Sequence, residues 1–425
     1  MGGGNQLHKS LFMLTAKWIA VTTLLATLFG PNAAAASPSG QSENTVTLVV
    51  RSSAYARFET LHDMPLFNLD GMLRAERGKL SEFAPELTDL YVRVAGPAQN
   101  RTFRITRSGH LWEENTGVQM ILPKETSARM LKEGEGLRTR HYGRLLRWQE
   151  ADRIFYRKCV FTVQDVETGL SFHVQRRAGR DHADVQPLTR KDTKVMKIIY
   201  GGKWSWKRRA IVVRLGEERI AASMNGKPHG GDGIPDNDFS GHFCIHFLES
   251  TTHKSTLPDV AHQMMVYKAA GQPRTYISAA APERLAESLV HAMNERDPEW
   301  VRLLTEGVAL TKQDEVLRKM DTLAAIRSAA PKLQDAAEAV DALVAPLAWK
   351  VDMSPSGGGR RSTKWSMRYL RPSFFSPWQL NDILLEPTRK HGPIMRNQRR
   401  SWQYVRVEPA PYVTYNRLKK EDDRP

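Results

Sequence analysis

The sequence predicts an α+β fold that is mainly β, on two observations. Between residues 46 and 272, short runs of β-branched and aromatic residues alternate with glycine- and proline-containing turns, which is typical of strands. Beyond Pro282 the apolar residues recur three or four positions apart, as on one face of a helix. The chain of 425 residues is long enough for two or three domains. Its 41% hydrophobic and 25% charged residues exclude a disordered, collagenous or multi-span membrane protein.

The first 36 residues have the features of a secretory signal peptide. Lys9 and Lys17 precede an apolar run at 18–29, and small residues follow at 33–36. This run is shorter than the roughly 20 apolar residues that a membrane span needs, and an uncleaved anchor is the alternative. We therefore expect an exported protein and, in a bacterium, one of the envelope, in the cell wall or on its extracellular face, with only the signal segment at the membrane. A polar linker is expected at 37–45.

Residues 46–150 are predicted to form a small β-rich domain. Its β-prone runs lie at 46–50, 90–94, 102–105 and 118–122. This segment offers no pairing of a nucleophile with a base, so we interpret it as a wall-binding or spacing module. The next segment, 151–272, carries predicted strands at 160–163, 171–174 and 210–214, and a short helix from Thr189 to Tyr200.

Residues 282–425 are predicted to be helical at first and then a basic α+β region. Pro282, Pro298 and Pro331 stand where helices are expected to begin. Three apolar sets mark the expected helix faces: Leu285, Leu289 and Met293; Val316, Met320 and Leu323; Leu333, Val340 and Val344.

The chain has a formal net charge of +16, which indicates an anionic partner. In the last 75 residues Lys and Arg outnumber Asp and Glu by 15 to 7, so half of this charge lies in the tail. Because export is expected, we predict anionic cell-wall polymers as the partner and no nucleic acid. A solvated basic strand region that completes the preceding domain is the alternative.

The segment whose residue types suit catalysis contains Cys244, one of two cysteines in the chain. His242 and His246 flank it in an apolar run, and His229 lies 15 residues upstream in a glycine turn with Gly230 and Gly231. A thiol is mostly protonated at pH 7, so a cysteine nucleophile needs a base or a cation beside it. His229 is the candidate base.

These residues resemble the L,D-transpeptidase catalytic domain of bacterial cell-wall enzymes. The family has a His-Gly pair, about fifteen residues, and then a Ser/Thr-His-Gly-Cys-Ile/Val-Arg run; here His229-Gly230 and the run from Gly241 to His246 are similar to these two elements. The resemblance covers about residues 160–250 and implies a β-rich catalytic domain at 151–272. We expect no cofactor and no metal in it.

The resemblance also implies the roles of individual residues. Cys244 would be the acyl-accepting nucleophile, His229 its base, and Gly230 would orient that histidine through its carbonyl. Backbone N–H groups near Phe243 and Cys244 would form the oxyanion hole. The implied reaction is acyl transfer on peptidoglycan stem peptides, either to an amine (L,D-transpeptidation) or to water (L,D-carboxypeptidation).

The chain departs from the family pattern at three positions. Gly241 replaces the Ser/Thr, Phe243 replaces the glycine before the cysteine, and His246 replaces the arginine after it. The lost arginine leaves open how a substrate carboxylate is held, and Phe243 is expected to narrow the approach to the thiol. The catalytic candidates are Cys244, His229, Gly230 and His242. The candidates for contacts with the oxyanion or the substrate are Phe243, Gly231, Ser240, His246, His182 and Asp184.

Several alternatives remain open from the residues alone. His182 and Asp184 could line the cleft and orient His229, or Asp184 could cap a turn. With His229 they could instead form the zinc site of an envelope peptidase. Cys159 and Cys244 could form a structural disulfide. A non-catalytic peptidoglycan-binding protein is a further alternative.

Two tryptophans upstream of the candidate base are also ambiguous. Trp204 and Trp206, expected on one face of a strand, could stack on sugar or peptide or simply pack.

Overall fold

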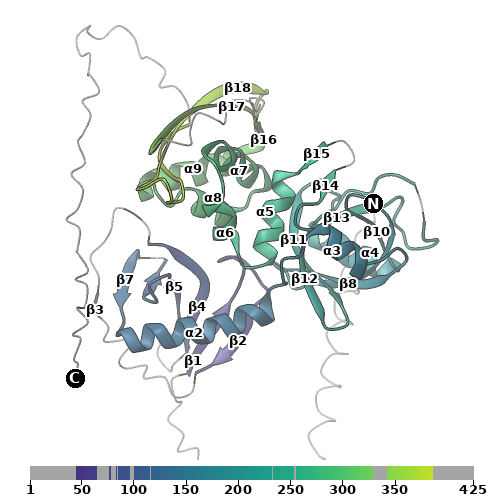
Figure 1. The fold of residues 1–425 in the computed structure, drawn as a ribbon, viewed down its shortest axis with the longest axis horizontal. Coiled ribbons are helices and arrows are strands. Elements are labelled where there is room, and N and C mark those ends of the chain that lie inside the picture. Colours follow the sequence, from purple (N-terminus) through teal and green to yellow (C-terminus); the bar gives the residue numbers. More distant parts are fainter. Residues whose placement is uncertain are drawn as a thin grey trace, which may run out of the picture.

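The computed structural model describes residues 45–64, 76–77, 83, 85–95, 100–114, 116–231, 233–252, 255–328 and 342–385. The predicted signal peptide, most of the predicted linker and the last 40 residues of the basic tail lie outside these residues. Within the described part the fold is α+β and rich in antiparallel strands, as predicted. Figure 1 shows three bodies of β-structure arranged around a central group of helices.

The N-terminal body is a seven-stranded antiparallel sheet covered by one long helix. Its strand order is β2-β1-β4-β5-β6-β7-β3. The strands are β1 (Thr45–Val50), β2 (Thr60–Asp63), β3 (Glu76–Arg77), β4 (Leu87–Ala95), β5 (Asn100–Thr106), β6 (Leu111–Glu113) and β7 (Val118–Ile121). All four predicted β-prone runs are therefore strands, and Thr45, which was assigned to the linker, begins β1.

The helix on this sheet, α2 (Lys124–His141), was not predicted. Its sequence contains Gly134 and Gly136, which weaken a helical pattern. Gly134 has a packing reason: a Cβ there would lie 2.5 Å from Cδ2 of Leu90 on β4. Gly134 therefore lets the helix approach the sheet closely, although glycine has a low intrinsic preference for the helical conformation.

The central body is a closed six-stranded barrel with the order β10-β13-β12-β11-β8-β9. Its strands are β8 (Val160–Asp165), β9 (Ser171–Ala178), β10 (Ala183–Pro187), β11 (Arg208–Leu215), β12 (Glu218–Asn225) and β13 (Phe243–His246). The predicted runs in this segment all fall on strands. Aromatic and aliphatic side chains fill the barrel interior, among them Phe161, Phe172 and Phe243.

Two helices accompany the barrel, α3 (Trp148–Ile154) and α4 (Arg190–Ile199). The second confirms the helix predicted from Thr189 to Tyr200. Thr189 is its N-cap: the Thr189 side chain accepts a hydrogen bond from the backbone N–H of Asp192, whose carboxylate in turn accepts from the N–H of Thr189.

The C-terminal body is a four-stranded antiparallel sheet packed on helices. The helices are α5 (Val260–Ala269), α6 (Pro273–Ser278), α7 (Pro282–Glu295), α8 (Pro298–Leu304) and α9 (Leu310–Thr322). The sheet has the order β16 (Leu323–Ser328), β17 (Val344–Pro355), β18 (Arg361–Leu370) and β19 (Gln379–Leu384), and a small β14 (Thr251–Thr252) and β15 (Ser255–Pro258) pair lies beside the barrel.

Pro282 and Pro298 begin helices as predicted. The third predicted helical set is wrong at Val344, which begins strand β17, while Leu333 and Val340 lie outside the described residues. Leu323 likewise begins β16 directly after α9. Alternate residues of β17, among them Trp349 and Val351, face the helices. The apolar residues of this segment therefore follow the two-residue period of a strand, and the helix prediction missed it.

Buried charges join the three bodies. Arg104 of β5 forms an ion pair with Glu299 of α8, and both side chains are buried. Lys268, at the end of α5, lies 2.6 Å from both Glu167, in the β8–β9 turn, and Asp297, the N-cap of α8. Since a buried charge is costly without its partner, these pairs fix how the bodies meet.

Candidate active site

Strand alternation decides which side chains of β13 can do chemistry. Phe243 and Ile245 are fully buried inside the barrel, so the neighbours Cys244 and His246 point to the opposite face. The expectation that Phe243 narrows the approach to the thiol is therefore wrong. Phe243 packs on Phe172 and Phe239 in the core, on the other side of the strand from the sulfur.

The structure brings Cys244 and His229 together. Nε2 of His229 lies 3.3 Å from Sγ of Cys244, within hydrogen-bond distance for sulfur. Nδ1 of the same ring lies 2.8 Å from the carbonyl oxygen of Lys227, which can only accept, so Nδ1 carries the hydrogen and Nε2 faces the thiol. The carbonyl was predicted to be that of Gly230, and this detail is wrong: the chain turns back so that Lys227 supplies it.

A short antiparallel bridge holds the histidine loop against β13. The N–H of His229 donates to the carbonyl of His242 at 3.0 Å, and the N–H of His242 donates to the carbonyl of His229 at 2.7 Å. Gly230 has φ +72°, and a Cβ there would lie 2.3 Å from Cε1 of His242. Gly241 has φ +95°, and its Cβ would lie 2.3 Å from the carbonyl oxygen of His229. Both glycines are needed because L side chains fit neither the conformation nor the space.

Strand β10 supplies the carboxylate next to the thiol. Asp184 pairs with Cys244 across the two strands, and its Oδ1 lies 3.8 Å from Sγ. The same oxygen lies 3.2 Å from Nε2 of His182 and 3.6 Å from Nε2 of His242. Asp184 is thus a strand residue and not a turn cap, and it lies beside His182 and His242.

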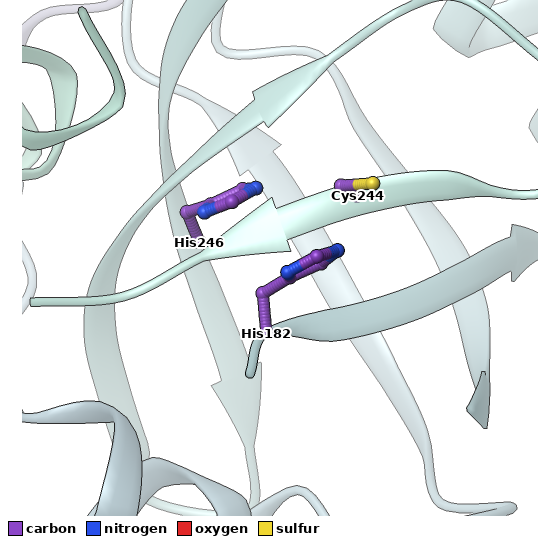
Figure 2. A group of neighbouring side chains, drawn as sticks. All are labelled: His182, Cys244 and His246. Atoms are coloured by element: carbon purple, nitrogen blue, oxygen red, sulfur yellow. The ribbon is translucent and has the colours of Figure 1, made fainter. Parts of the chain in front are cut away.

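Three buried histidines stack behind the thiol. The rings of His182 and His246 lie 4.4 Å apart, and those of His246 and His262 lie 3.8 Å apart. Figure 2 shows His182 and His246 with nearly parallel rings beside Cys244. Nδ1 of His262 is 2.9 Å from the hydroxyl oxygen of Ser223. His246 is only 2% exposed, so it does not replace the family's arginine as a contact for substrate.

The charges around Cys244 favour its thiolate. Burial raises the pKa of the thiol, but hydrogen bonds and positive charge from His182 and His229 outweigh burial, and the pKa of Cys244 lies below its ordinary value. The hydrogen bond to Cys244 raises the pKa of His229. Burial opposes a charge on His182, yet Asp184 and Cys244 raise the pKa of His182 to about 10. Burial holds the pKa values of His246 and His262 well below the ordinary range.

Two groups of side chains here contain metal-binding atom types, and neither is assigned a metal. The ligand atoms of His182, Cys244 and His246 lie within 4.8 Å of one another, as do those of His229, His242 and Cys244. In the first group, the rings of His182 and His246 stack at 15°, so their in-plane lone pairs run side by side and do not converge on one point. In the second group, His229 already contacts the thiol directly. The zinc alternative named His182, Asp184 and His229 together, which is neither of these groups.

Cys159 and Cys244 are both free thiols, so the disulfide alternative is not what the structure shows. Cys159 packs in the barrel core. Gly231 and Ser240 lie exposed on the loops around the site. Their roles toward an oxyanion or a substrate, like that of the N–H groups near Phe243, stay predictions.

Trp206 stands at the entrance to the site. Its ring is 5.0 Å from that of His229 and the residue is 53% exposed, whereas Trp204 packs edge-on against Phe239. Both precede β11 and do not share a strand face as predicted. A cleft of about 390 Å³ lies elsewhere, between the N-terminal sheet and α8, and is lined by Arg138 and Trp300. Since Cys244 is 5% exposed, we expect a substrate to approach past Trp206 and His229.

The carbonyl oxygen of Thr251 lies 2.8 Å from Nδ1 of His182. The sequence interpretation missed four contributors: the carbonyls of Lys227 and Thr251, and the side chains of Ser223 and His262. The carbonyl groups carry no signal in the sequence. Asp259 is the N-cap of α5, and an aspartate at this position is typical of a helix start. It could have indicated that His262, three residues later, stands in the first turn of a helix. No known family model matches the chain, and no curated protein matches it.

Proposed function

We propose that the chain is an exported cell-wall enzyme that transfers acyl groups through Cys244 on peptidoglycan stem peptides. The observation that carries the proposal is the pair of Cys244 and His229 at 3.3 Å, with the histidine oriented by a backbone carbonyl. This is the nucleophile and base arrangement that covalent acyl transfer requires. The substrate class comes from the resemblance of the two sequence elements to L,D-transpeptidases and from the net charge of +16, which suits an anionic wall.

In the proposed reaction, His229 takes the proton of the Cys244 thiol through Nε2. The thiolate attacks the carbonyl carbon of a stem-peptide amide, and the resulting oxyanion collapses to a thioester as the C–N bond breaks. Protonated His229 gives its proton to the departing amine of the terminal D-amino acid. An acceptor amine then attacks the thioester and yields a cross-link, or water attacks and yields a carboxylic acid, with His229 taking a proton from either.

Mass spectrometry of the purified chain with tetrapeptide muropeptides, and separately with a carbapenem, tests this proposal. We expect an acyl adduct on Cys244 that is absent from Cys244→Ala and retained in Cys159→Ala, which removes the other thiol. Absence of adduct and of product from a folded, reduced protein would contradict it.

The two alternatives predict different results. A non-catalytic wall-binding protein predicts co-sedimentation with insoluble peptidoglycan that survives Cys244→Ala, together with no turnover by the unmutated chain. A zinc-dependent envelope peptidase predicts stoichiometric zinc in the purified protein and cleavage that stops with a chelator. We expect turnover to persist in the presence of a chelator.

The proposed location depends on residues 1–36, which lie outside the described part of the chain. Among the described residues, no helix has the length and apolar character to cross a membrane.

A further inference from the structure

A buried carboxylate beside the nucleophile opposes the proposed chemistry. Asp184 is 5% exposed, and its Oδ1 lies 3.8 Å from the sulfur of Cys244. Two negative charges at this distance, away from water, repel each other strongly. A thiolate can therefore form only if a cation offsets Asp184.

His182 is placed to be that cation. Its side chain is 1% exposed, its Nδ1 lies 2.8 Å from the carbonyl oxygen of Thr251, and its Nε2 lies 3.2 Å from Oδ1 of Asp184. A carbonyl oxygen only accepts, so Nδ1 carries a hydrogen. Nε2 lies at ion-pair distance from the carboxylate, and without a hydrogen its lone pair would stand beside a negatively charged oxygen, so this contact is favourable only when Nε2 is protonated as well. A histidine with two N–H groups is an imidazolium.

The turn before β10 fixes this histidine in place. Gly179 has φ +94°, and a Cβ on it would lie 1.9 Å from the carbonyl oxygen of His182. The backbone of Gly179 therefore passes close to that of His182, and the carbonyl of Thr251 in β14 holds the ring at Nδ1. His182 has little freedom to leave the carboxylate.

The other titratable groups that face this cluster are less suited than His182 to offset the charge of Asp184. His246 of β13 stacks on it, and His262 of α5 stacks on His246; burial keeps the pKa values of both well below the ordinary range, so they are neutral at pH 7. His242 is also within ion-pair distance of Asp184, at 3.6 Å, but its side chain is 20% exposed against 1% for His182, so water screens its charge more, and His229 faces the sulfur.

We infer that His182 is a positioning residue whose fixed imidazolium charge neutralises Asp184 and so allows Cys244 to become a thiolate next to a buried carboxylate. With both charges present, Asp184 and His182 cancel, and Cys244 and His229 form the second ion pair. Without the His182 imidazolium, the carboxylate and the thiolate are left facing the more exposed histidines, His229 and His242. That the thiolate of Cys244 acts as a nucleophile rests on the proposed function. The charge relation, in which His182 offsets Asp184 and lowers the pKa of Cys244, does not depend on any substrate.

Alkylation of Cys244 by iodoacetamide tests the inference on the full chain without peptidoglycan. All variants are made in Cys159→Ala, so that one thiol reacts, and the rate is measured from pH 5 to pH 10. We expect His182→Gln to raise the apparent pKa of Cys244 by about one pH unit or more, which lowers the alkylation rate at neutral pH about tenfold. Adding Asp184→Asn to His182→Gln removes the uncompensated anion and should restore most of this loss.

The matched control is His173→Gln, because His173 also lies beside a carboxylate, 3.5 Å from Oδ1 of Asp192, on an exposed part of the barrel. This variant should leave the alkylation profile unchanged. A folded His182→Gln protein with the profile of the control would overturn the inference, and so would a loss that Asp184→Asn fails to rescue.

A second measurement needs no variant. In ¹⁵N NMR of the histidine rings at pH 8, after Cys244 has been alkylated so that His229 has no thiolate to pair with, at least one ring should still show both nitrogens protonated, and a spectrum without such a ring would overturn the inference even if His182→Gln does not fold. If both experiments give the expected results while muropeptides leave Cys244 unmodified, the proposed substrate fails and the charge relation stands.

Discussion

The charge of His229 should control the reactivity of Cys244 by an amount that follows from their separation. At 3.3 Å, the attraction between an imidazolium and a thiolate is about 1 kcal/mol in a water-like medium and about 5 kcal/mol in the partly buried environment of a protein. The His229 residue is partly exposed, so screening by solvent places the effect toward the lower end, at about 1 to 3 kcal/mol. This corresponds to roughly one to two pH units in the pKa of the thiol.

The substitution His229→Gln retains a polar side chain of similar reach and removes the charge. We expect the alkylation profile of Cys244 to move to higher pH by the amount above, and the alkylation rate at neutral pH to fall about tenfold or more. Trp206→Ala is the control for a change in access, because it opens the entrance without removing a charge. It should alter the rate at every pH and leave the midpoint in place. A midpoint that stays in place in His229→Gln would refute the assignment of His229 as the partner of the thiol.

Three further predictions concern the scaffold. Gly230→Ala should lower the stability by about 1–3 kcal/mol in urea unfolding, through its positive φ and the clash with the ring it would meet, and should slow acylation. Gly357→Ala, in the turn between β17 and β18, where an added Cβ has no neighbour within 4 Å, should do neither. Glu299→Gln should cost about 3 kcal/mol, the low end for a broken buried pair, because, among the described residues, it leaves buried Arg104 with only the more exposed Glu114 nearby, at 3.3 Å; an unchanged unfolding midpoint would contradict this. Burial holds His246 and His262 neutral in the folded protein. Below about pH 6.5 the unfolded chain therefore binds more protons than the folded one, and the free energy of unfolding falls as the pH falls. The slope is up to about 1.4 kcal/mol per pH unit for each histidine. Thermal unfolding between pH 4 and 7 measures this, and a flat profile would count against it.

Short-range sequence patterns predicted many of the strands and helices correctly. The β-prone runs, the helix after Thr189 and the helices at Pro282 and Pro298 are where short-range preferences place them. The pattern failed where a local preference and a tertiary contact disagree. Helix α2 contains Gly134 because β4 lies against it, and Val344 stands in a strand whose alternate residues pack on helices.

The candidate site divides in the same way. The spacing of His229 and Cys244 was sufficient to pair them, and a period of two within β13 puts Cys244 and His246 on one face, a rule that also places Phe243 in the core. The sequence pattern gave no sign that His246 would be buried between two other imidazoles, because His262 arrives on a helix from a different part of the chain.

The sequence by itself determined the order of the elements, the pairing of a thiol with a base 15 residues earlier, and the excess of positive charge. Tertiary structure alone decided the electrostatic setting of that thiol. Asp184 stands 60 residues before Cys244 and meets it only because β10 and β13 pair in one register of a closed barrel. Register is a long-range property: it depends on how whole strands bury their faces, and no spacing along the chain specifies which residue of one strand will lie opposite which residue of the other.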